Sequence, residues 1–165
     1  MDELDLELHA AELITALDRG GLTVSVSESL TGGQLAMTIA RSPGSAPVFL
    51  GGLVAYHRIT KHRLLGTEPD AVVTPEAAVT MAQSTRTLLA TDIAVSVTGV
   101  AGPDEQEGVP VGTVFGGWAV EERAGAERWH FEGDPAEICQ QTVDAALRMA
   151  SRVASAEHEA RHVSA

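Results

Sequence analysis

The chain has 165 residues, of which 44% are hydrophobic, and it carries a formal net charge of −12. This length fits a single domain with its own core, which we take to span residues 1–165. The acidic excess argues against nucleic acid and anionic membranes as partners, because both are bound through clustered lysine and arginine.

The start of the chain is acidic, with Asp2, Glu3 and Asp5, where a secretory signal would be basic. No apolar run approaches the roughly 18 residues that are needed to span a bilayer. We therefore expect a cytoplasmic protein.

The sequence offers little support for a metal or a cofactor. The single cysteine, Cys139, excludes an internal disulfide and a multi-cysteine metal site, and we expect a buried thiol there. His158 and His162 have the i,i+4 spacing of a helical metal site, but no third ligand accompanies them. Phosphate-loop, dinucleotide-binding and zinc-protease motifs are absent from the sequence. We expect neither a metal nor a cofactor.

The first half of the chain alternates helices and strands. An amphipathic helix that stops at Gly20 is predicted by apolar residues at helical spacing, which are Leu4, Leu8, Ala11, Ile14 and Leu17. A short strand over 22–26 follows. A second helix over 35–40 ends before Ser42, and an apolar strand spans 48–56.

The next elements are a short helix over 58–65 that is closed by Gly66, and a helix from Thr74 to about Ala90. The buried side of the second helix is expected to include Ala78, Met81, Ala82, Leu88 and Leu89. A strand over 93–97 breaks at Thr98.

The last part of the chain is expected to form a hairpin and a helix. The hairpin has strands over 111–120 and 128–131, joined across 121–127. Asp134 and Glu137 form a capping box at the start of the final helix, and the tail from Glu157 onward is expected to fray. This order of elements predicts an α/β fold with a mixed sheet between helix layers.

Three segments leave predicted strands in the same way: 29–33, 56–61 and 98–103. In open α/β sheets the binding crevice lies at the carboxyl ends of the parallel strands. We expect the three segments to meet there and to form the site. The glycine pair after Ser29 lets backbone N–H groups approach a ligand, although such a pair before a helix is also ordinary turn chemistry.

Lys61 is the only lysine, and the other ten of the 11 basic residues are arginines. It lies five residues after the only tyrosine, Tyr56. A lysine amine can lose its proton and act as a base, whereas a guanidinium stays charged. A serine with a lysine base is a known arrangement for amide hydrolysis, and Ser29 is the natural candidate. An ordinary solvated lysine is the competing interpretation.

The run from His57 to Arg63 holds five cationic or titratable side chains in seven residues. In so acidic a chain, this concentration favours a pocket for negative charge. A solvated basic helix face is the alternative.

Four ordered motifs together resemble the CinA C-terminal domain, the competence and damage inducible protein family, over roughly residues 6–154, which we take as the domain core. They are Glu-Ser-Leu-Thr-Gly-Gly at 28–33, Phe-Leu-Gly-Gly-Leu-Val-Ala-Tyr at 49–56 with Lys61, Thr-Gly-Val-Ala-Gly-Pro at 98–103, and Pro-Val-Gly-Thr-Val at 110–114. The resemblance implies a three-layer α/β/α sandwich that self-associates, with a dimer favoured. It also implies an amidohydrolase that converts nicotinamide mononucleotide and water to nicotinic acid mononucleotide and ammonia.

The resemblance also implies roles for residues at matching positions. Ser29 would be the nucleophile, Lys61 the base, and Tyr56 a neighbour that shares their hydrogen bonding. Backbone donors and nucleotide-lining groups would come from Thr31, Gly32, Gly33, Thr98, Gly99 and Gly102. Arg58 does not match the family pattern, and we add it as a substrate-binding candidate that compensates for missing cations. Because free lysine titrates near about 10.4, the site must lower the pKa of Lys61 by burial or by nearby cations such as Arg58 and Arg63.

Several positions depart from the family pattern. His57 and Arg58 replace a common Ser-Asn, Val109 replaces a common lysine, and basic residues of the last helix are replaced at Pro135 and Cys139. Ala46 stands where a second serine is often found. Two alternatives therefore accompany the deamidase: a catalytically silent nucleotide-binding or partner-binding module, and an amidase for a different small amide.

Overall fold

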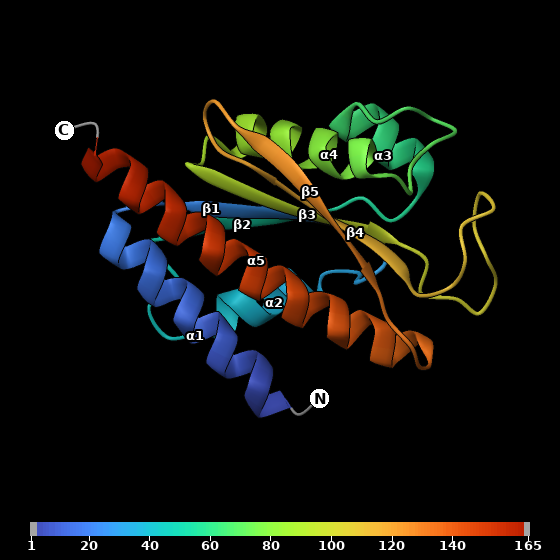
Figure 1. The fold of residues 1–165 in the computed structure, drawn as a ribbon, viewed down its shortest axis with the longest axis horizontal. Coiled ribbons are helices and arrows are strands. Elements are labelled where there is room, and N and C mark those ends of the chain that lie inside the picture. The colour runs from blue at the N-terminus through green and yellow to red at the C-terminus, as the bar shows by residue number, and fades with distance from the viewer. Residues whose placement is uncertain (1–2, 164–165) are drawn as a thin grey trace.

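A five-stranded mixed sheet lies between two helix layers in a computed structural model of the protein, which describes residues 3–163 (Figure 1). The predicted α/β sandwich is therefore confirmed. In chain order, the elements are α1 Glu3–Gly20, β1 Val24–Glu28, α2 Gln34–Arg41, β2 Phe49–Val54, α3 Arg58–Leu65, α4 Pro75–Leu89, β3 Ile93–Gly99, β4 Thr113–Ala119, β5 Ala124–His130 and α5 Pro135–Val163.

The strand order is β2-β1-β3-β4-β5, with β1 parallel to β2 and β3. Glu28 at the end of β1 is level with Val54 on β2 and with Val97 on β3. The carboxyl ends of these three strands therefore meet at one edge of the sheet. β4 and β5 add an antiparallel hairpin beyond β3.

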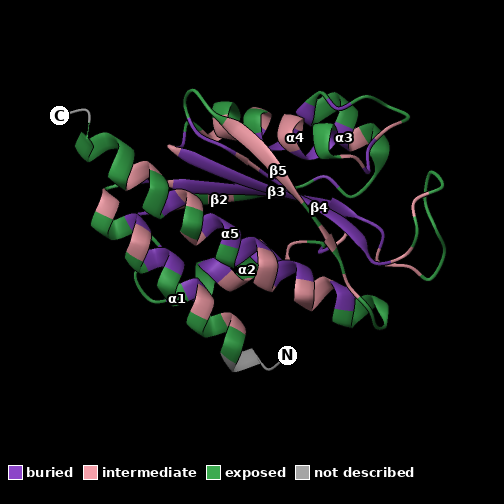
Figure 2. Cartoon of the chain, in the orientation of Figure 1, coloured by how far each residue is buried: buried purple, intermediate pink, exposed green. Residues whose placement is uncertain are grey.

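The two faces of β1 have different surroundings, because successive side chains of a strand point to opposite faces. Val24 and Val26 belong to the main apolar core, which they share with residues of α1, α2 and α5. Ser25 faces the other side, where its hydroxyl contacts that of Thr91 at 2.7 Å. The central strands are buried throughout, as Figure 2 shows in purple.

Two helices exist as predicted, and part of each predicted buried face is confirmed, since the buried residues include Ile14 and Leu17 of α1 and Ala78, Met81 and Ala82 of α4. Leu8 is 57% exposed and Ala11 is exposed, because α1 packs against α5 through a stripe in which Ala10 and Leu13 accompany Ile14 and Leu17. The side chain of Leu4, also in the predicted stripe, lies outside the described residues. Leu88 is 54% exposed, so the buried side of α4 does not reach it.

The predicted hairpin loop over 121–127 was too long. β5 begins at Ala124 and pairs with β4 from Ala119 onward, and the turn is closed by the Val120 N–H on the Arg123 carbonyl at 2.8 Å. β5 is an edge strand whose residues are half-exposed or exposed. Its composition is therefore polar, and the sequence lacks the apolar pattern that would have predicted a strand there. The capping box of α5 is confirmed, since Asp134 and Glu137 exchange hydrogen bonds of 2.8 and 2.9 Å.

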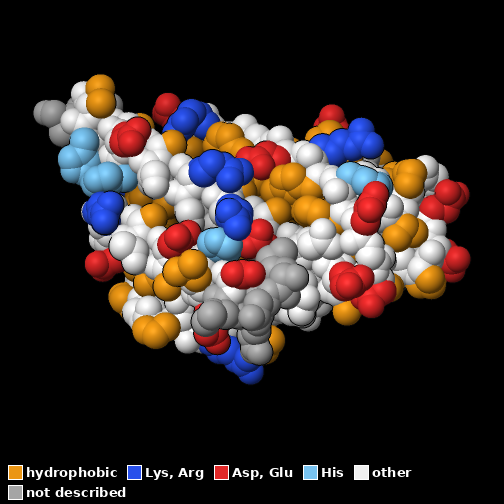
Figure 3. Space-filling model, turned by 60° about the horizontal axis from the view of Figure 1, so that its bottom comes forward, with side chains coloured by type: hydrophobic (Ala, Val, Ile, Leu, Met, Phe, Trp, Pro, Cys, Tyr) orange, Lys and Arg blue, Asp and Glu red, His pale blue; other side chains and the backbone are white. Residues whose placement is uncertain are grey.

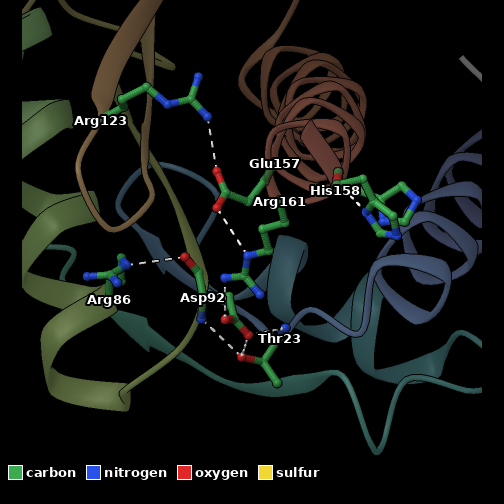
Figure 4. Close-up of polar contacts among 8 residues, drawn as sticks. Thr23, Arg86, Asp92, Arg123, Glu157, His158 and Arg161 are labelled. Atoms are coloured by element: carbon green, nitrogen blue, oxygen red, sulfur yellow. Dashed lines mark hydrogen bonds and ion pairs between the residues drawn. The ribbon is translucent and has the colours of Figure 1, made fainter. Parts of the chain in front are cut away.

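The predicted fraying from Glu157 was also wrong, because α5 continues to Val163. Figure 4 shows the reason: Arg161 donates to Asp92, at the start of β3, at 2.8 Å. It also donates to Glu157, which accepts from Arg123 of the hairpin as well. The end of α5 is thus tied to the sheet by ion pairs that no local sequence signal reveals.

Surface properties agree with the composition. Acidic, basic and apolar side chains are interspersed on the face seen in Figure 3. Within residues 3–163, none of the helices combines the length and the hydropathy that a bilayer-spanning segment requires.

Asp92→Asn is expected to lower the free energy of unfolding by roughly 1 kcal/mol at pH 7. Burial acts to raise the pKa of Asp92, but hydrogen bonds from Arg161 and Thr23 outweigh it and hold this pKa below its ordinary value. The stabilisation is therefore present above the unfolded pKa and is lost as the pH falls through the folded one.

Urea unfolding between pH 7 and pH 2 checks this, with Arg148→Gln, which removes an exposed i,i+4 pair on the same helix α5, as the control. A difference between wild type and Asp92→Asn that stays constant over this range would contradict it.

Candidate functional site

Ser29 lies at the carboxyl end of β1 and is only 4% exposed. Its N–H donates to the Val97 carbonyl at 3.1 Å, which extends the pairing of β1 with β3 by one residue. The next residue of β3 is Thr98, and the Ala55 N–H donates to the Glu28 carbonyl on the other side. The three segments predicted to form the site therefore start side by side.

Glu28, the residue before Ser29, is fully buried. Its carboxylate accepts hydrogen bonds from the Thr31 hydroxyl at 2.6 Å and from backbone N–H groups of Gly33, Leu35 and Ala36 at 3.2, 3.0 and 2.8 Å. Gly33 is the N-cap of α2 and has no side chain, so Glu28 satisfies the free donors of the helix start instead. No local sequence pattern indicated this role of Glu28.

This arrangement changes the expectation for the glycine pair. The Gly33 N–H is bound to Glu28, and the Gly32 N–H donates to the Ser29 carbonyl at 3.0 Å, so neither is free to bind a ligand here. Both glycines have positive φ, +57° and +106°, and that conformation explains the residue type. Among the described residues, the N–H groups of Leu30 and Thr31 have no protein acceptor.

Lys61 projects from α3 into the interior and is 2% exposed. Its amine donates to the Thr98 hydroxyl oxygen at 3.2 Å, and no hydrogen bond among the described residues joins it to Ser29. Burial lowers the pKa of Lys61 from 10.5 to about 8, while Glu107 acts to raise it. The solvated interpretation is therefore wrong, and burial rather than Arg58 or Arg63 causes the shift.

Thr98 is fully buried and positions the Lys61 amine. Its hydroxyl donates to the Val72 carbonyl at 2.6 Å, so an oxygen lone pair remains for the lysine. We expected Thr98 to line the nucleotide; here it is the hydrogen-bond partner of the candidate base.

The other predicted residues lie further from this pair. Tyr56 is 70% exposed, and its hydroxyl has no hydrogen bond among the described residues, so it does not share those of Ser29 and Lys61 here. Arg58 is exposed and pairs with Asp70 at 3.2 Å. It borders a cavity of about 240 Å³ that His62 and Arg63 also line.

Gly99 and Gly102 have local structural reasons to be glycine. A Cβ on Gly99 would lie 2.8 Å from the Thr113 carbonyl oxygen, so the close pairing of β3 with β4 requires its absence. Gly102 has φ +98°. Whether either residue lines a ligand remains a prediction.

Cys139 of α5 reaches the Ser29 turn, since its thiol donates to the Leu30 carbonyl at 3.2 Å. The thiol is half-buried, and burial, then the Glu28 carboxylate, raise its pKa. Val109 packs against the apolar cluster that contains Val72 and Val73. In residues 3–163, histidine, cysteine and acidic side chains form no group of three that could hold a metal.

Comparison with known proteins identifies the family. The family model of the CinA C-terminal domain matches residues 6–154. The chain belongs to this family.

Relatives in two bacteria carry the name competence-damage inducible protein. The one from Desulforamulus reducens is 38% identical over 135 residues, which are 79% of this chain and 33% of that protein. The one from Levilactobacillus brevis is 41% identical over 145 residues, 84% and 35% of the two chains. This chain thus spans about a third of the length of the curated relatives that it matches.

Solved structures share the fold. A CinA superfamily protein from Klebsiella pneumoniae has a TM-score of 0.86 at 25% identity and covers 91% of this chain and 98% of its own. A competence/damage inducible protein from Agrobacterium tumefaciens has a TM-score of 0.82 at 31% identity, with 88% and 93% covered.

Glu28→Gln is expected to destabilise the fold by roughly 3 kcal/mol, because a neutral amide accepts at only one atom and turns an N–H group toward the helix donors. Glu137→Gln, at the exposed capping box of α5, is the matched control and should cost less than about 1 kcal/mol. Chemical denaturation of both variants measures this, and equal losses would refute the role of Glu28.

Lys61→Met is expected to make the protein more stable than wild type at pH 7, by an amount that shrinks toward pH 10. The pKa of Lys61 is lower in the folded state than in the unfolded state. At pH 7 the folded protein therefore binds this proton less tightly, which lowers the free energy of unfolding by roughly 3 kcal/mol. This cost disappears as the pH rises from about 8 to 10.5.

The difference in unfolding free energy between Lys61→Met and wild type, measured at several pH values, is the test. Arg63→Met removes an exposed cation from the same helix and should show no such trend. The same slope in both variants would mean that burial of Lys61 is not its source.

Proposed function

We propose that this chain hydrolyses the carboxamide of nicotinamide mononucleotide, giving nicotinic acid mononucleotide and ammonia, with Ser29 as nucleophile and Lys61 as base. One observation carries the proposal: the only lysine is buried at the strand edge that holds Ser29, and its pKa is lowered to about 8. A substantial neutral fraction near pH 8 is what a general base needs.

The reaction follows in two halves. Neutral Lys61 takes the Ser29 hydroxyl proton as Oγ attacks the carboxamide carbon. The resulting ammonium gives this proton to the amide nitrogen, so that the C–N bond breaks and ammonia leaves. Water then attacks the acyl-enzyme with Lys61 again as base, which releases the carboxylic acid and regenerates Ser29. The amine must move from Thr98 toward Ser29, and the register of β1 and β3 makes these residues neighbours.

The developing oxyanion needs donors, and we assign this role to the Leu30 and Thr31 N–H groups. They follow the nucleophile directly and have no protein acceptor among the described residues. The Gly32 and Gly33 N–H groups hold the turn and the helix start instead.

The substrate phosphate is assigned to the cavity beside α3, where Arg58 and Arg63 supply positive charge and His62 also lines the wall. Arg58 would exchange its exposed Asp70 partner for the phosphate, which costs little because exposed ion pairs are weak. Thr98, Gly99 and Gly102 remain the proposed lining of the nucleotide.

The protein is further proposed to act as a cytoplasmic homo-oligomer, with a dimer favoured. Supporting this, β2 is an edge strand whose Leu50 and Val54 are 46% and 48% exposed, and Tyr56, which follows it in the chain, is 70% exposed. Edge strands with exposed apolar side chains favour association.

A catalytically silent nucleotide-binding module is the second candidate. Two observations favour it: the Lys61 amine is bonded to Thr98 rather than to Ser29, and Val109 and Cys139 stand at positions where cations were expected. Such a module would bind nicotinamide mononucleotide without releasing ammonia.

Ammonia release from nicotinamide mononucleotide, without added metal, is expected for wild type and should be abolished by Ser29→Ala. Lys61→Arg should reduce kcat by at least about a hundredfold, because a guanidinium cannot accept the proton. Ser155→Ala, at an exposed position of α5, should keep full activity.

Substrate binding by calorimetry separates the candidates. Binding with no turnover in wild type would establish the silent module, and turnover of other small amides but not of the nucleotide would establish a different amidase. Full activity of Ser29→Ala would end the proposed mechanism.

A further inference from the structure

Glu107 occupies a backbone position that does not suit it. Gln106 and Val109 close a tight turn through two backbone hydrogen bonds of 3.2 and 2.8 Å, with Glu107 and Gly108 between them at φ +55° and +72°. Turns with two positive φ values strongly favour asparagine, aspartate or glycine, because other residues pay for the left-handed conformation. A glutamate here needs a compensating contact.

The side chain of Glu107 makes that contact across the chain. Although Glu107 is exposed as a residue, its Oε2 accepts hydrogen bonds from the N–H groups of Val72 and Val73 at 3.1 and 3.3 Å. Both valines are buried, in the segment that connects α3 to α4. The carboxylate therefore fixes the backbone of a connecting segment 34 residues away in sequence.

That segment holds the candidate base through one intermediate. The Val72 carbonyl accepts the Thr98 hydroxyl hydrogen at 2.6 Å, and the Thr98 oxygen accepts from the Lys61 amine at 3.2 Å. Glu107, Val72, Thr98 and Lys61 thus form a continuous chain of contacts, three of whose members are buried.

We propose that Glu107 is a positioning residue that acts on Lys61 through Val72 and Thr98, so that the turn at 106–109 controls both the orientation and the charge of the base. This inference rests on the proposed function of Lys61. It adds a residue that touches neither Ser29 nor the expected substrate positions.

The charge of Glu107 also acts on Lys61. It is the carboxylate that raises the pKa of Lys61 against the larger lowering by burial. The other charged groups nearby are held elsewhere: Glu28 of β1 is bound to the α2 start on the other sheet face, and Glu76 of α4 is exposed. On α3 itself, His57 caps the helix, Arg58 pairs with Asp70, His62 binds the Thr67 carbonyl, and Arg63 is exposed.

Because the chain has one lysine, its titration can be observed directly. Protein labelled with ¹³C at the lysine ε carbon gives a single side-chain signal, whose shift against pH reports the pKa of Lys61 without any need for activity. Glu107→Gln retains an oxygen that can accept from Val72 and Val73 but removes the charge. Its expected result is a Lys61 pKa below the wild-type value. Glu105→Gln makes the same charge change at an exposed position of the same loop and should leave that pKa at about 8.

Glu107→Ala tests the contacts, since it removes the acceptor as well. We expect kcat for ammonia release to fall by about tenfold or more with KM unchanged, because Thr98, which holds the amine within reach of Ser29, loses its fixed position. Glu107→Gln should recover much of this loss, and the midpoint of its kcat against pH should move down together with the Lys61 titration.

The outcomes separate this inference from the proposed function. If wild type releases no ammonia, the function fails, yet the titrations still decide whether Glu107 acts on Lys61. An unchanged Lys61 pKa in Glu107→Gln, or a shift equal to that of Glu105→Gln, overturns the inference even if the enzyme is active. Thermal unfolding of each variant is the control that checks whether its fold is intact.

Discussion

The burial of one amine against one hydroxyl is the constraint on which the candidate site depends. Lys61 has a single hydrogen-bond partner among the described residues, Thr98, although an ammonium has three donors. An ammonium with so few partners in a dry environment is unstable, and the group responds by losing its proton more easily. The same feature that costs stability at neutral pH therefore supplies a base. A buried lysine lowers the free energy of unfolding, because an apolar side chain would fill the same space better. A residue that lowers stability in this way indicates a functional position.

Glu28, a second buried ionisable group at the same sheet edge, differs from Lys61 in having many hydrogen-bond partners. Glu28 is as deeply buried as Lys61, but four donors surround its two oxygens, three of them the free N–H groups of a helix start. The carboxylate is thereby solvated by the protein. The Glu28 carboxylate at the end of β1 thus has a structural role at the start of α2, and Ser29 is the next residue in the chain. Since Glu28 fixes the start of α2, it also fixes the turn that presents Ser29 and the Leu30 and Thr31 N–H groups.

The sequence predicted the parts of this site that depend on local or compositional signals. The unusual Lys61, the strand ends at Ser29 and Thr98, and the helix starting at Arg58 were all recognised from short patterns. The role of the Gly33 N–H was predicted incorrectly, because the group that binds it lies five residues upstream and belongs to a strand. The end of α5 was missed for a similar reason: its ion pair with Asp92 joins residues 69 positions apart. Sequence patterns report conformational propensity and the spacing of neighbouring residues. The hydrogen bond of Gly33 and the end of α5 depend instead on side chains that the tertiary fold brings into contact.

The turn at 106–109 joins these observations. Its two central residues have positive φ, which strains Glu107 but not Gly108, and the Glu107 carboxylate accepts hydrogen bonds from the backbone N–H groups of Val72 and Val73. The next residue, Val109, packs against the apolar cluster that contains these two valines, at a position where the family resemblance leads one to expect a lysine. The segment that carries the Thr98 acceptor is therefore held by hydrogen bonds to Glu107 and by the apolar cluster to which its valines belong. Under the proposed function, Val109 supplies apolar packing at a position where a cation would hold the substrate, and α3 is the proposed source of that positive charge.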